Sequence, residues 1–282
     1  MRVDRGVGQG PIAQLPRHGE SPFRYAERVP SDSIALGVLS LWSFRVEGIP
    51  DPAAPYTVFP DGCTSVAIAR NGGASPMLVC RGPSLTAARP NVLPGARYLG
   101  FRLWPDASAL VTGAPARALR DYIGPAQGVL AERFAGLERE VPDWSDDHHA
   151  FAALDRALVR RLAPLGPPDP RVRAAVRAIV AGRGEVRMDA VACSAGIGLR
   201  QLQRRFPAAT GLTLREFARV RRLREALGQR VSAAQTGWSR IAAGSGFVDH
   251  AHLTREFVAL TGIQPSLAAL QLGLTDHEDV RP

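Results

Sequence analysis

The side chains whose types and spacing most clearly suggest chemistry lie in two short segments near the C-terminal end of the chain. Arg200, Gln203 and Arg204 follow the i, i+3, i+4 spacing that places side chains on one face of a helix. Arginine and glutamine are suited to bidentate hydrogen bonds with guanine and adenine edges in a DNA major groove. The second set of candidate base readers comprises His250, Ala251, Thr254 and Arg255.

The two sets lie in two copies of an internal repeat. The first copy contains Ala192, Gly196, Leu202, Phe206 and Gly211, and the second contains Ala242, Gly246, Leu253, Phe257 and Gly262. The intervals are 4, 6, 4 and 5 residues in the first copy and 4, 7, 4 and 5 in the second. Small alanines let two helices cross closely, and the glycine after them supplies a left-handed turn. Each copy therefore predicts a helix-turn-helix, whose second helix normally enters the major groove.

The helices of the repeats can be bounded by local signals. The first helices are expected over residues 186–194 and 238–243, and Cys193 is expected in the core of the first unit. The second helix of the first copy should begin near Gly198 and end early at Pro207, because proline lacks the N–H that a helix interior uses. In the second copy Asp249 is a good N-cap for a helix over residues 250–260.

A further helix is predicted between the two copies. Thr213 and Glu216 form a T-x-x-E capping box, and the apolar periodicity continues to Gly228. About 15 residues span roughly 22 Å, so this rod could hold two recognition helices about one DNA turn apart. Candidate phosphate contacts on it are Arg215, Arg219, Arg221, Arg222 and Arg224, although some would instead be solvated or paired with Glu216 and Glu225. Gln201 and His252 are further candidates for phosphate contacts.

The charge of the chain is concentrated in this region. All 35 basic residues are arginine, against 26 acidic residues, which gives a formal net charge of +9 over 282 residues. Residues 171–270 hold 16 arginines against 6 acids, a net of +10, whereas residues 1–170 have a net of +1 and residues 271–282 a net of −2. Charge concentrated in one domain is typical of a protein that binds a polyanion.

The sequence predicts an α+β protein of two domains. Residues 164–168 form a Pro/Gly linker between a β-rich domain (1–163) and an all-α domain with two helix-turn-helix units (169–270), and an acidic tail follows (271–282). Asp169 and Pro170 are an N-cap and N1 pair that opens a helix ending at 181. The N-terminal domain should be a small barrel or sandwich with strands over 33–46, 56–59, 64–69, 77–80 and 98–104, and with helices over 116–123, 126–139 and 147–162.

Other candidate sites favour a structural interpretation. Cys63 lies in a Pro-Asp-Gly-Cys turn and could be a redox or alkylation sensor, but such a cysteine is more often a small buried hydrophobe. The run Asp146-Asp147-His148-His149 should fan around a helix and not converge on a metal, and Gly6-x-Gly8-x-Gly10 lacks the flanking strand and helix of a phosphate loop. The sequence therefore predicts no enzyme, no cofactor and no metal. Two alternatives stay open: an N-terminal enzyme or covalent sensor built on Cys63, and an architectural protein that binds DNA without sequence preference.

The C-terminal motifs resemble those of the AraC/XylS family of bacterial transcription regulators. The residues that carry the resemblance are Leu202-Gln203-Arg204-x-Phe206-x4-Gly211, Arg222-Leu223-x2-Ala226, and Ile241-Ala242-x3-Gly246-Phe247-x-Asp249-x2-His252-Leu253-x-Arg255-Glu256-Phe257-x4-Gly262-x2-Pro265-Ser266. They cover roughly residues 169–270. The N-terminal half resembles, less specifically, the domain attached to one subgroup, through Phe59-Pro60-Asp61-Gly62-Cys63, Gly100-Phe101-Arg102-Leu103-Trp104-Pro105 and Pro115-x3-Leu119-x-Asp121.

The resemblance implies seven helices, two helix-turn-helix units on a linker helix, and double-stranded promoter DNA as the ligand. It implies that the N-terminal half is a β-rich sensor or dimerisation domain. RNA polymerase, a small-molecule effector and a second copy of the chain are the further expected partners. The longest apolar run (34–42) is too short to span a membrane and the start of the chain lacks the apolar core of a signal peptide, so a cytoplasmic protein with no membrane partner is expected.

Overall fold

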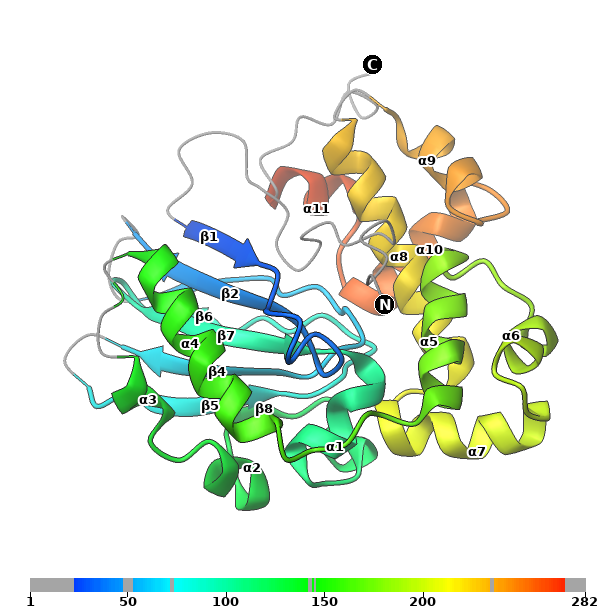
Figure 1. Cartoon of the computed structure of the whole chain (residues 1–282). Coiled ribbons are helices and arrows are strands. Elements are labelled where there is room, and N and C mark those ends of the chain that lie inside the picture. The colour runs from blue at the N-terminus through cyan, green and yellow to red at the C-terminus, as the bar shows by residue number, and fades with distance from the viewer. Residues whose placement is uncertain are drawn as a thin grey trace.

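The chain folds into a sheet domain with a helical domain at its side, as the computed structural model in Figure 1 shows. The structure describes residues 23–47, 53–71, 74–141, 144, 146–233 and 236–271. The predicted acidic tail, apart from residue 271, and the glycine motif at residues 6–10 lie outside this range. The predicted combination of a β-rich N-terminal domain and an all-α C-terminal domain is confirmed.

One antiparallel sheet of six strands forms the frame of the N-terminal domain. Its strand order is β1 (Phe23–Arg28), β2 (Val38–Val46), β7 (Arg97–Leu103), β4 (Ser65–Arg70), β5 (Met77–Arg81) and β8 (Ile123–Pro125). The strands β3 (Ala54–Pro55) and β6 (Asn91–Val92) pair as a separate ribbon. An aromatic cluster around Phe44 and Tyr56 joins this ribbon to one face of the sheet, so the domain is layered like a sandwich.

Helices cover the other face of the sheet. They are α1 (Ser108–Thr112), α2 (Gly128–Arg133), α3 (Leu137–Glu140) and α4 (Asp147–Leu162), with the 3-10 turns η1 (Pro105–Ala107) and η2 (Ala116–Leu119). Leu41 and Phe101 of the sheet share one core with Phe134 and Leu158 of this layer. Figure 1 shows α4 lying along the sheet, which gives this predicted helix its place.

Two helix predictions in this domain are wrong, the strand predicted over 56–59 is only an isolated bridge at Val58, and one strand was missed. The helix predicted over 116–123 is only the short turn η2, because Asp121 has a positive φ of 57° and Ile123 already pairs in β8. The helix predicted over 126–139 is broken into α2 and α3 by Gly136 in the left-handed conformation. Strand β1 was not predicted, because its charged residues hide the alternation; its ladder with β2 runs from Phe23 to Arg28.

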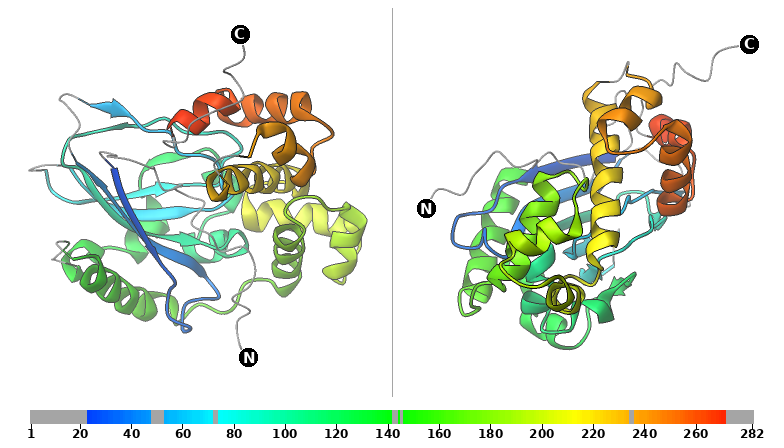
Figure 2. Two further views of the ribbon diagram at one scale, coloured as in Figure 1. Left: turned by 90° about the horizontal axis from the view of Figure 1, so that it is seen from above. Right: turned by 90° about the vertical axis from the view of Figure 1, so that its right-hand side faces the viewer.

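The C-terminal domain has seven helices in the described part of the chain. They are α5 (Pro170–Ala181), α6 (Met188–Ser194), α7 (Leu199–Thr210), α8 (Leu214–Ser232), α9 (Trp238–Gly244), α10 (His250–Thr261) and α11 (Pro265–Gln271). Asp169 caps α5 through the N–H of Arg171, and Thr213 and Glu216 form the predicted capping box of α8. The helix α8 joins two cores, one with α5–α7 and one with α9–α11. In the right view of Figure 2, α8 stands as a rod between α7 and the pair α9 and α10.

Two helices continue past their predicted ends. The helix α7 passes through Pro207 to Thr210, because Phe206 and Thr210 are almost fully buried and the Thr210 hydroxyl bonds the Phe206 carbonyl oxygen. The helix α8 passes through Gly228 to Ser232, where Arg230 is buried against the ring of Trp238. In both cases tertiary burial outweighs the local helix-breaking signal.

The loop around residues 59–63 joins the sheet domain to α8. Phe59 is buried in the second helical core, beside Leu223 and Leu227 of α8. Gly62 has a φ of +73°, and a Cβ atom added there would lie 2.8 Å from the ring of Phe217. This turn therefore requires glycine for its backbone conformation and for its close approach to α8.

A Gly62→Ala substitution should lower the free energy of unfolding by about 2 to 4 kcal/mol, because it adds a left-handed backbone penalty to an overpacked contact. Urea denaturation followed by circular dichroism measures this change. Gly166→Ala is the matched control, since Gly166 is exposed and a Cβ there meets nothing within 4 Å. Equal stability losses in the two variants would contradict the assigned role of Gly62.

Candidate nucleic-acid interface

The outer face of α7 carries the first predicted set of readers. Arg200, Gln203 and Arg204 are exposed, whereas Leu202 and Phe206 on the opposite face are fully buried. Helix entry at Gly198 has no side-chain cap, as the absence of a hydroxyl or carboxylate there predicts. The structure thus brings the three polar side chains to one free surface.

The outer face of α10 carries the second set. His250, Ala251 and Arg255 are exposed, and Thr254 is half-buried beside them. Leu253 and Phe257 form the buried side of the same helix. The start of α10 is held by Asp249, whose carboxylate accepts the His252 N–H at 2.6 Å.

The ring of His252 is fixed at the edge of this surface. Its Nδ1 accepts the Val248 N–H at 3.2 Å, and its ring meets Phe247 edge-on at 5.5 Å between centroids. Because Nδ1 accepts a hydrogen bond, Nε2 carries the proton of the neutral ring and is the donor left for a ligand. The structure therefore leaves the Nε2–H of His252 at the edge of the surface as an available hydrogen-bond donor.

The two helix-turn-helix units agree in detail. Their turn glycines, Gly196 and Gly246, have φ values of 64° and 71°, and both second helices end at a left-handed glycine, Gly211 or Gly262. Before each of these glycines a buried threonine bonds back to the carbonyl oxygen of the core phenylalanine, over 2.9 Å in the first unit and 2.7 Å in the second. The repeat found by spacing is thus a structural repeat.

The five arginines of α8 that are candidate phosphate contacts divide into three groups. Arg215 is exposed and free to meet a phosphate. Arg219 pairs with Glu256 of α10 at 2.8 Å, and Arg222 donates to the Gly246 carbonyl oxygen at 3.4 Å and lies over the ring of Phe247. These two arginines tie α8 to the second unit.

Two other candidates, Arg221 and Arg224, face the sheet domain. Arg224 is 3% exposed and Arg221 is half-buried, so the expectation that Arg224 meets phosphate is wrong. Both approach Asp61 closely enough for their charges to interact with its carboxylate. Sequence reasoning missed this role because arginine is usually exposed, and no signal within α8 indicates that the loop 59–63 docks on Arg224.

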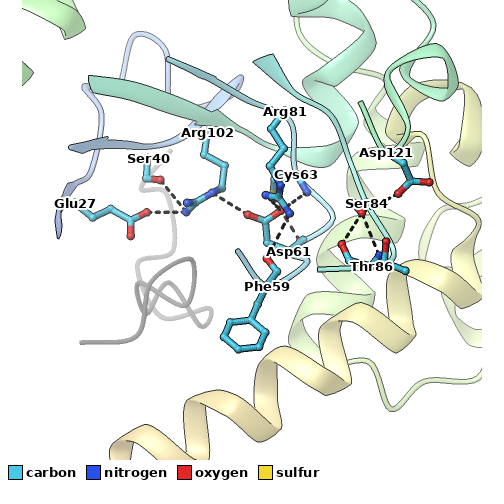
Figure 3. Close-up of polar contacts among 10 residues, drawn as sticks. All are labelled: Glu27, Ser40, Phe59, Asp61, Cys63, Arg81, Ser84, Thr86, Arg102 and Asp121. Carbon is cyan, nitrogen blue, oxygen red and sulfur yellow. Dashed lines mark hydrogen bonds and ion pairs between the residues drawn. The ribbon is translucent and has the colours of Figure 1, made fainter. Parts of the chain in front are cut away.

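Asp61 is the anionic centre of this buried junction. Its carboxylate lies 3.2 Å from Arg102 Nε and 3.6 Å from Arg81 Nη1, and it accepts the Cys63 N–H at 2.9 Å. Figure 3 shows Asp61 between Arg81 and Arg102. Burial alone would raise the pKa of Asp61, but the arginines Arg81, Arg102 and Arg224 hold it below its ordinary value.

Positive charge exceeds negative charge in this junction. Arg102 also donates to Glu27 at 3.0 Å, so the two nearby carboxylates are both engaged. Nε and Nη1 of Arg224 are buried without a hydrogen-bond partner, and burial lowers the pKa of Arg224 to about 9 despite the attraction of Asp61. A buried guanidinium with unbonded N–H groups is costly unless an anion meets it.

Two of the three cysteines are buried, and the third, Cys193, is more exposed than predicted. Cys63 is buried, and burial together with the nearby Asp61 carboxylate raises the pKa of its thiol to about 12. Burial raises the pKa of Cys80 to about 12 as well. Cys193 was expected in a core but is exposed, because its neighbours Val191 and Ala192 occupy the inner face of α6.

The acidic and histidine cluster at the start of α4 converges more than expected. The ligand atoms of Asp146, His148 and His149 all lie within 4.8 Å of one another, so the expectation that they fan apart is wrong. Asp146 nevertheless serves as the N-cap, and its carboxylate accepts the N–H groups of His148 and His149 at 3.2 and 3.1 Å. Hydrogen bonds from these backbone groups lower the pKa of Asp146, which accounts for the cluster as a helix start.

Comparison with known proteins points to the same region. Residues 191–268 match a protein family described as a helix-turn-helix domain. No curated protein matches the chain. No helix among the described residues is long and apolar enough to cross a membrane.

Solved structures of ToxT from Vibrio cholerae are similar to most of the chain at low identity. ToxT from strain O395 has 10% identity and a TM-score of 0.44, over 89% of this chain and 98% of that one. A ToxT structure with a bound unsaturated fatty acid has 11% identity and a TM-score of 0.45, over 90% and 97% of the two chains.

The family match spans both repeats, α8 between them and the exposed faces of α7 and α10. It agrees with the family that the motifs of the C-terminal half resemble. Residues 191–268 are therefore a DNA-binding helix-turn-helix domain of the AraC type.

Proposed function

We propose that the chain is a sequence-specific transcription regulator that inserts α7 and α10 into successive major-groove segments of double-stranded promoter DNA. The observation that carries this proposal is the pair of equivalent helices whose outer faces are free and polar while their inner faces are buried. Residues 171–270 also carry a net charge of +10, which suits a DNA backbone. The matched family is one of DNA-binding domains, not of enzymes.

The reading roles follow from side-chain chemistry. Arginine and glutamine offer paired hydrogen bonds to guanine and adenine, and alanine and the threonine methyl group fit the thymine methyl. The proposed base readers are Arg200, Gln203, Arg204, His250, Ala251, Thr254 and Arg255. Gln201, Arg215 and His252 would bind phosphates, while Arg219 and Arg222 act mainly as ties between α8 and the second unit.

The wider organisation is part of the same proposal. Residues 1–163 would form the regulatory domain, 164–168 the linker, 169–270 the DNA-binding domain and 271–282 an acidic tail. The regulator would work in the cytoplasm with RNA polymerase, and a second copy of the chain would bind a second site on the promoter.

An organic anion is the effector class that the buried charges favour. Arg224 has two guanidinium nitrogens without a hydrogen-bond partner, and the neighbouring carboxylates of Asp61 and Glu27 already meet Arg102. A carboxylate next to Arg224 would satisfy these N–H groups and neutralise a buried charge. Because Arg224 belongs to α8 and Asp61 to the sheet domain, an anion bound here would change how the two domains are held together.

Alanine substitutions of Arg204 and Arg255 should each weaken binding to the cognate duplex by about 1 to 3 kcal/mol and relax the preference for one base pair. The cognate duplex is one that the wild-type chain selects from a random pool, and fluorescence anisotropy gives its affinity. Arg97→Ala is the control, because it removes the same charge from an exposed position on β7.

If both variants bound cognate and scrambled DNA with the affinity of the wild-type chain, the assignment of Arg204 and Arg255 as base readers would be wrong. If the wild-type chain itself bound cognate and random duplexes equally at physiological salt, it would instead be an architectural DNA-binding protein.

Arg224→Met should raise the free energy of unfolding by about 1 to 4 kcal/mol at pH 7, because it removes a buried charge without full compensation. The folded pKa of Arg224 is about 9, below that of an unfolded arginine, so the wild-type penalty is complete at pH 7. It is relieved as the pH rises above about 9, where the folded state releases its proton first. Denaturation at pH 7 and pH 10 should therefore show a smaller difference between the variants at pH 10.

Arg215→Met on the exposed side of α8 controls for the loss of any arginine from this helix. A thermal-shift screen of carboxylic acids then tests the effector class: an acid that stabilises the wild-type chain should not stabilise Arg224→Met. A destabilised Arg224→Met would instead mean that its charge is already compensated in the folded chain.

The alternative of a covalent sensor at Cys63 has a direct test. A thiol reagent such as dithionitrobenzoate should label the exposed Cys193 rapidly in the folded chain, so that this thiol serves as the exposed control. It should reach Cys63 and Cys80 only after denaturation, because burial and their raised pKa values leave almost no thiolate. The variants Cys193→Ser and Cys63→Ser assign the signals. Fast labelling of Cys63 in the folded chain would favour the sensor.

A further inference from the structure

One segment of the sheet domain reaches both recognition helices. It consists of residues 83–89, named the strap here, and it lies between β5 and β6 in the sequence. At its start Pro83 lies against the end of α7, where a Cβ atom added to Gly211 would be 2.5 Å from the proline ring. At its end Arg89 donates to the Thr261 carbonyl oxygen of α10 at 2.6 Å.

The two ends of the strap meet equivalent points of the repeat. Gly211 ends α7 and Gly262 ends α10, and a Cβ atom added to Gly262 would lie 3.3 Å from the Arg89 guanidinium. Ala87 adds a second bond at this end, since its N–H donates to the Leu260 carbonyl oxygen at 2.8 Å. The strap therefore connects the carboxyl ends of the two recognition helices.

The middle of the strap joins the two helical cores. Leu85 is half-buried and packs against both the core of α5–α7 and the core of α9–α11. A side chain in contact with both units resists a change in their separation, because either unit could move away only by exposing apolar surface.

The strap is itself held by the sheet domain. The Ser84 hydroxyl donates to the Asp121 carboxylate at 2.7 Å and accepts the Thr86 N–H at 3.1 Å, as Figure 3 shows. The Asp121 N–H donates to the Pro83 carbonyl oxygen at 3.0 Å, and Ala88 pairs with Val58 through two backbone hydrogen bonds. The strap is thus a fixed span of the sheet domain and not a loose loop.

We propose that the strap sets the spacing of α7 and α10, with Leu85 and Arg89 as positioning residues, so that the regulator selects promoters by the separation of their half-sites. This inference rests on the proposed function. The helix α8 is the covalent link between the units, and the strap adds a second connection at the far ends of α7 and α10. The readers lie in the first half of each recognition helix and the strap meets the last residues, so the strap leaves the reading faces open.

Half-site spacing is a sensitive measure of this role. One inserted base pair moves the second half-site by about 3.4 Å along the DNA axis and by about 34° around it. Units of fixed spacing cannot follow this displacement, whereas units with a weakened connection between them can partly follow it. A weakened strap should therefore change spacing preference without changing the affinity for one half-site.

The experiment compares the wild-type chain with Leu85→Ala and Arg89→Ala on three oligonucleotide duplexes: the selected cognate site, the same site with one base pair inserted between the half-sites, and the site with its second half scrambled. The insertion should weaken wild-type binding about tenfold or more and the variants about threefold or less, with half-site affinity within about twofold of wild type. Arg97→Ala is again the control and should keep the wild-type ratio.

Thermal unfolding shows whether each variant is folded, and Arg89 is exposed enough that its truncation removes little packing. An unchanged spacing ratio in folded Arg89→Ala and Leu85→Ala would overturn the role of the strap. A wild-type chain that selects no site from the random pool would overturn the proposed function instead, and this result is distinct because it precedes any spacing measurement.

Discussion

A helix of seven residues and one of twelve cannot enclose an apolar core by themselves, and each helix-turn-helix unit here is such a pair. Both units therefore complete their cores with a third element. The helix α8 provides that element twice, with Leu214 and Phe217 in the first core and Leu223 and Leu227 in the second. At 19 residues it is about 28 Å long, so it fixes the distance between the units to first order.

The use of α8 by both units decides what its arginines can do. A helix that is apolar on the sides facing two cores and one docked loop has little surface left for DNA. Arg219 and Arg222 consequently bind groups of the second unit, and Arg224 is enclosed with Asp61. Net charge therefore overstates the cationic surface of the domain, and only some of the exposed arginines, Arg200, Arg204 and Arg255, lie on the second helix of either unit.

Local sequence signals were sufficient to predict features that depend only on the nearby backbone, such as helix caps and turns. The capping box at Thr213, the N-cap at Asp249 and the left-handed glycines of the repeat lie where the sequence predicted them. The same signals failed where burial opposed them. Pro207 lies inside α7 because the next turn is buried, and nothing within one helix turn of Arg224 could indicate that a distant loop covers it.

The reading faces were predictable for a further reason: in a repeat, each position of one copy can be compared with the equivalent position of the other copy. Leu202 and Leu253, or Phe206 and Phe257, are apolar in both copies, and this agreement defines the inner face without any structure. No second copy of the strap exists in the repeat, so its contacts could not be found in this way. The residue types of the strap suggest no particular role, and only its position between β5 and β6 makes these residues important.

The two ends of the strap hold the units by different forces. The last carbonyl groups of a helix lack partners within it and carry partial negative charge, and the Ala87 N–H and the Arg89 guanidinium supply donors there for α10. Pro83 cannot do the same for α7, because proline has no N–H, and its contact is one of shape. The helices that flank the first unit are instead fixed to the sheet domain by ion pairs, Glu216 of α8 with Arg120 at 2.8 Å and Arg173 of α5 with Asp106. Asp106 is buried and Arg173 is largely buried, so salt screens this ion pair little, and α7 itself packs against η1, η2 and α1. The sheet domain therefore holds both recognition helices, α7 through packing and the largely buried ion pair of its neighbour α5, and α10 through hydrogen bonds to its last carbonyl groups.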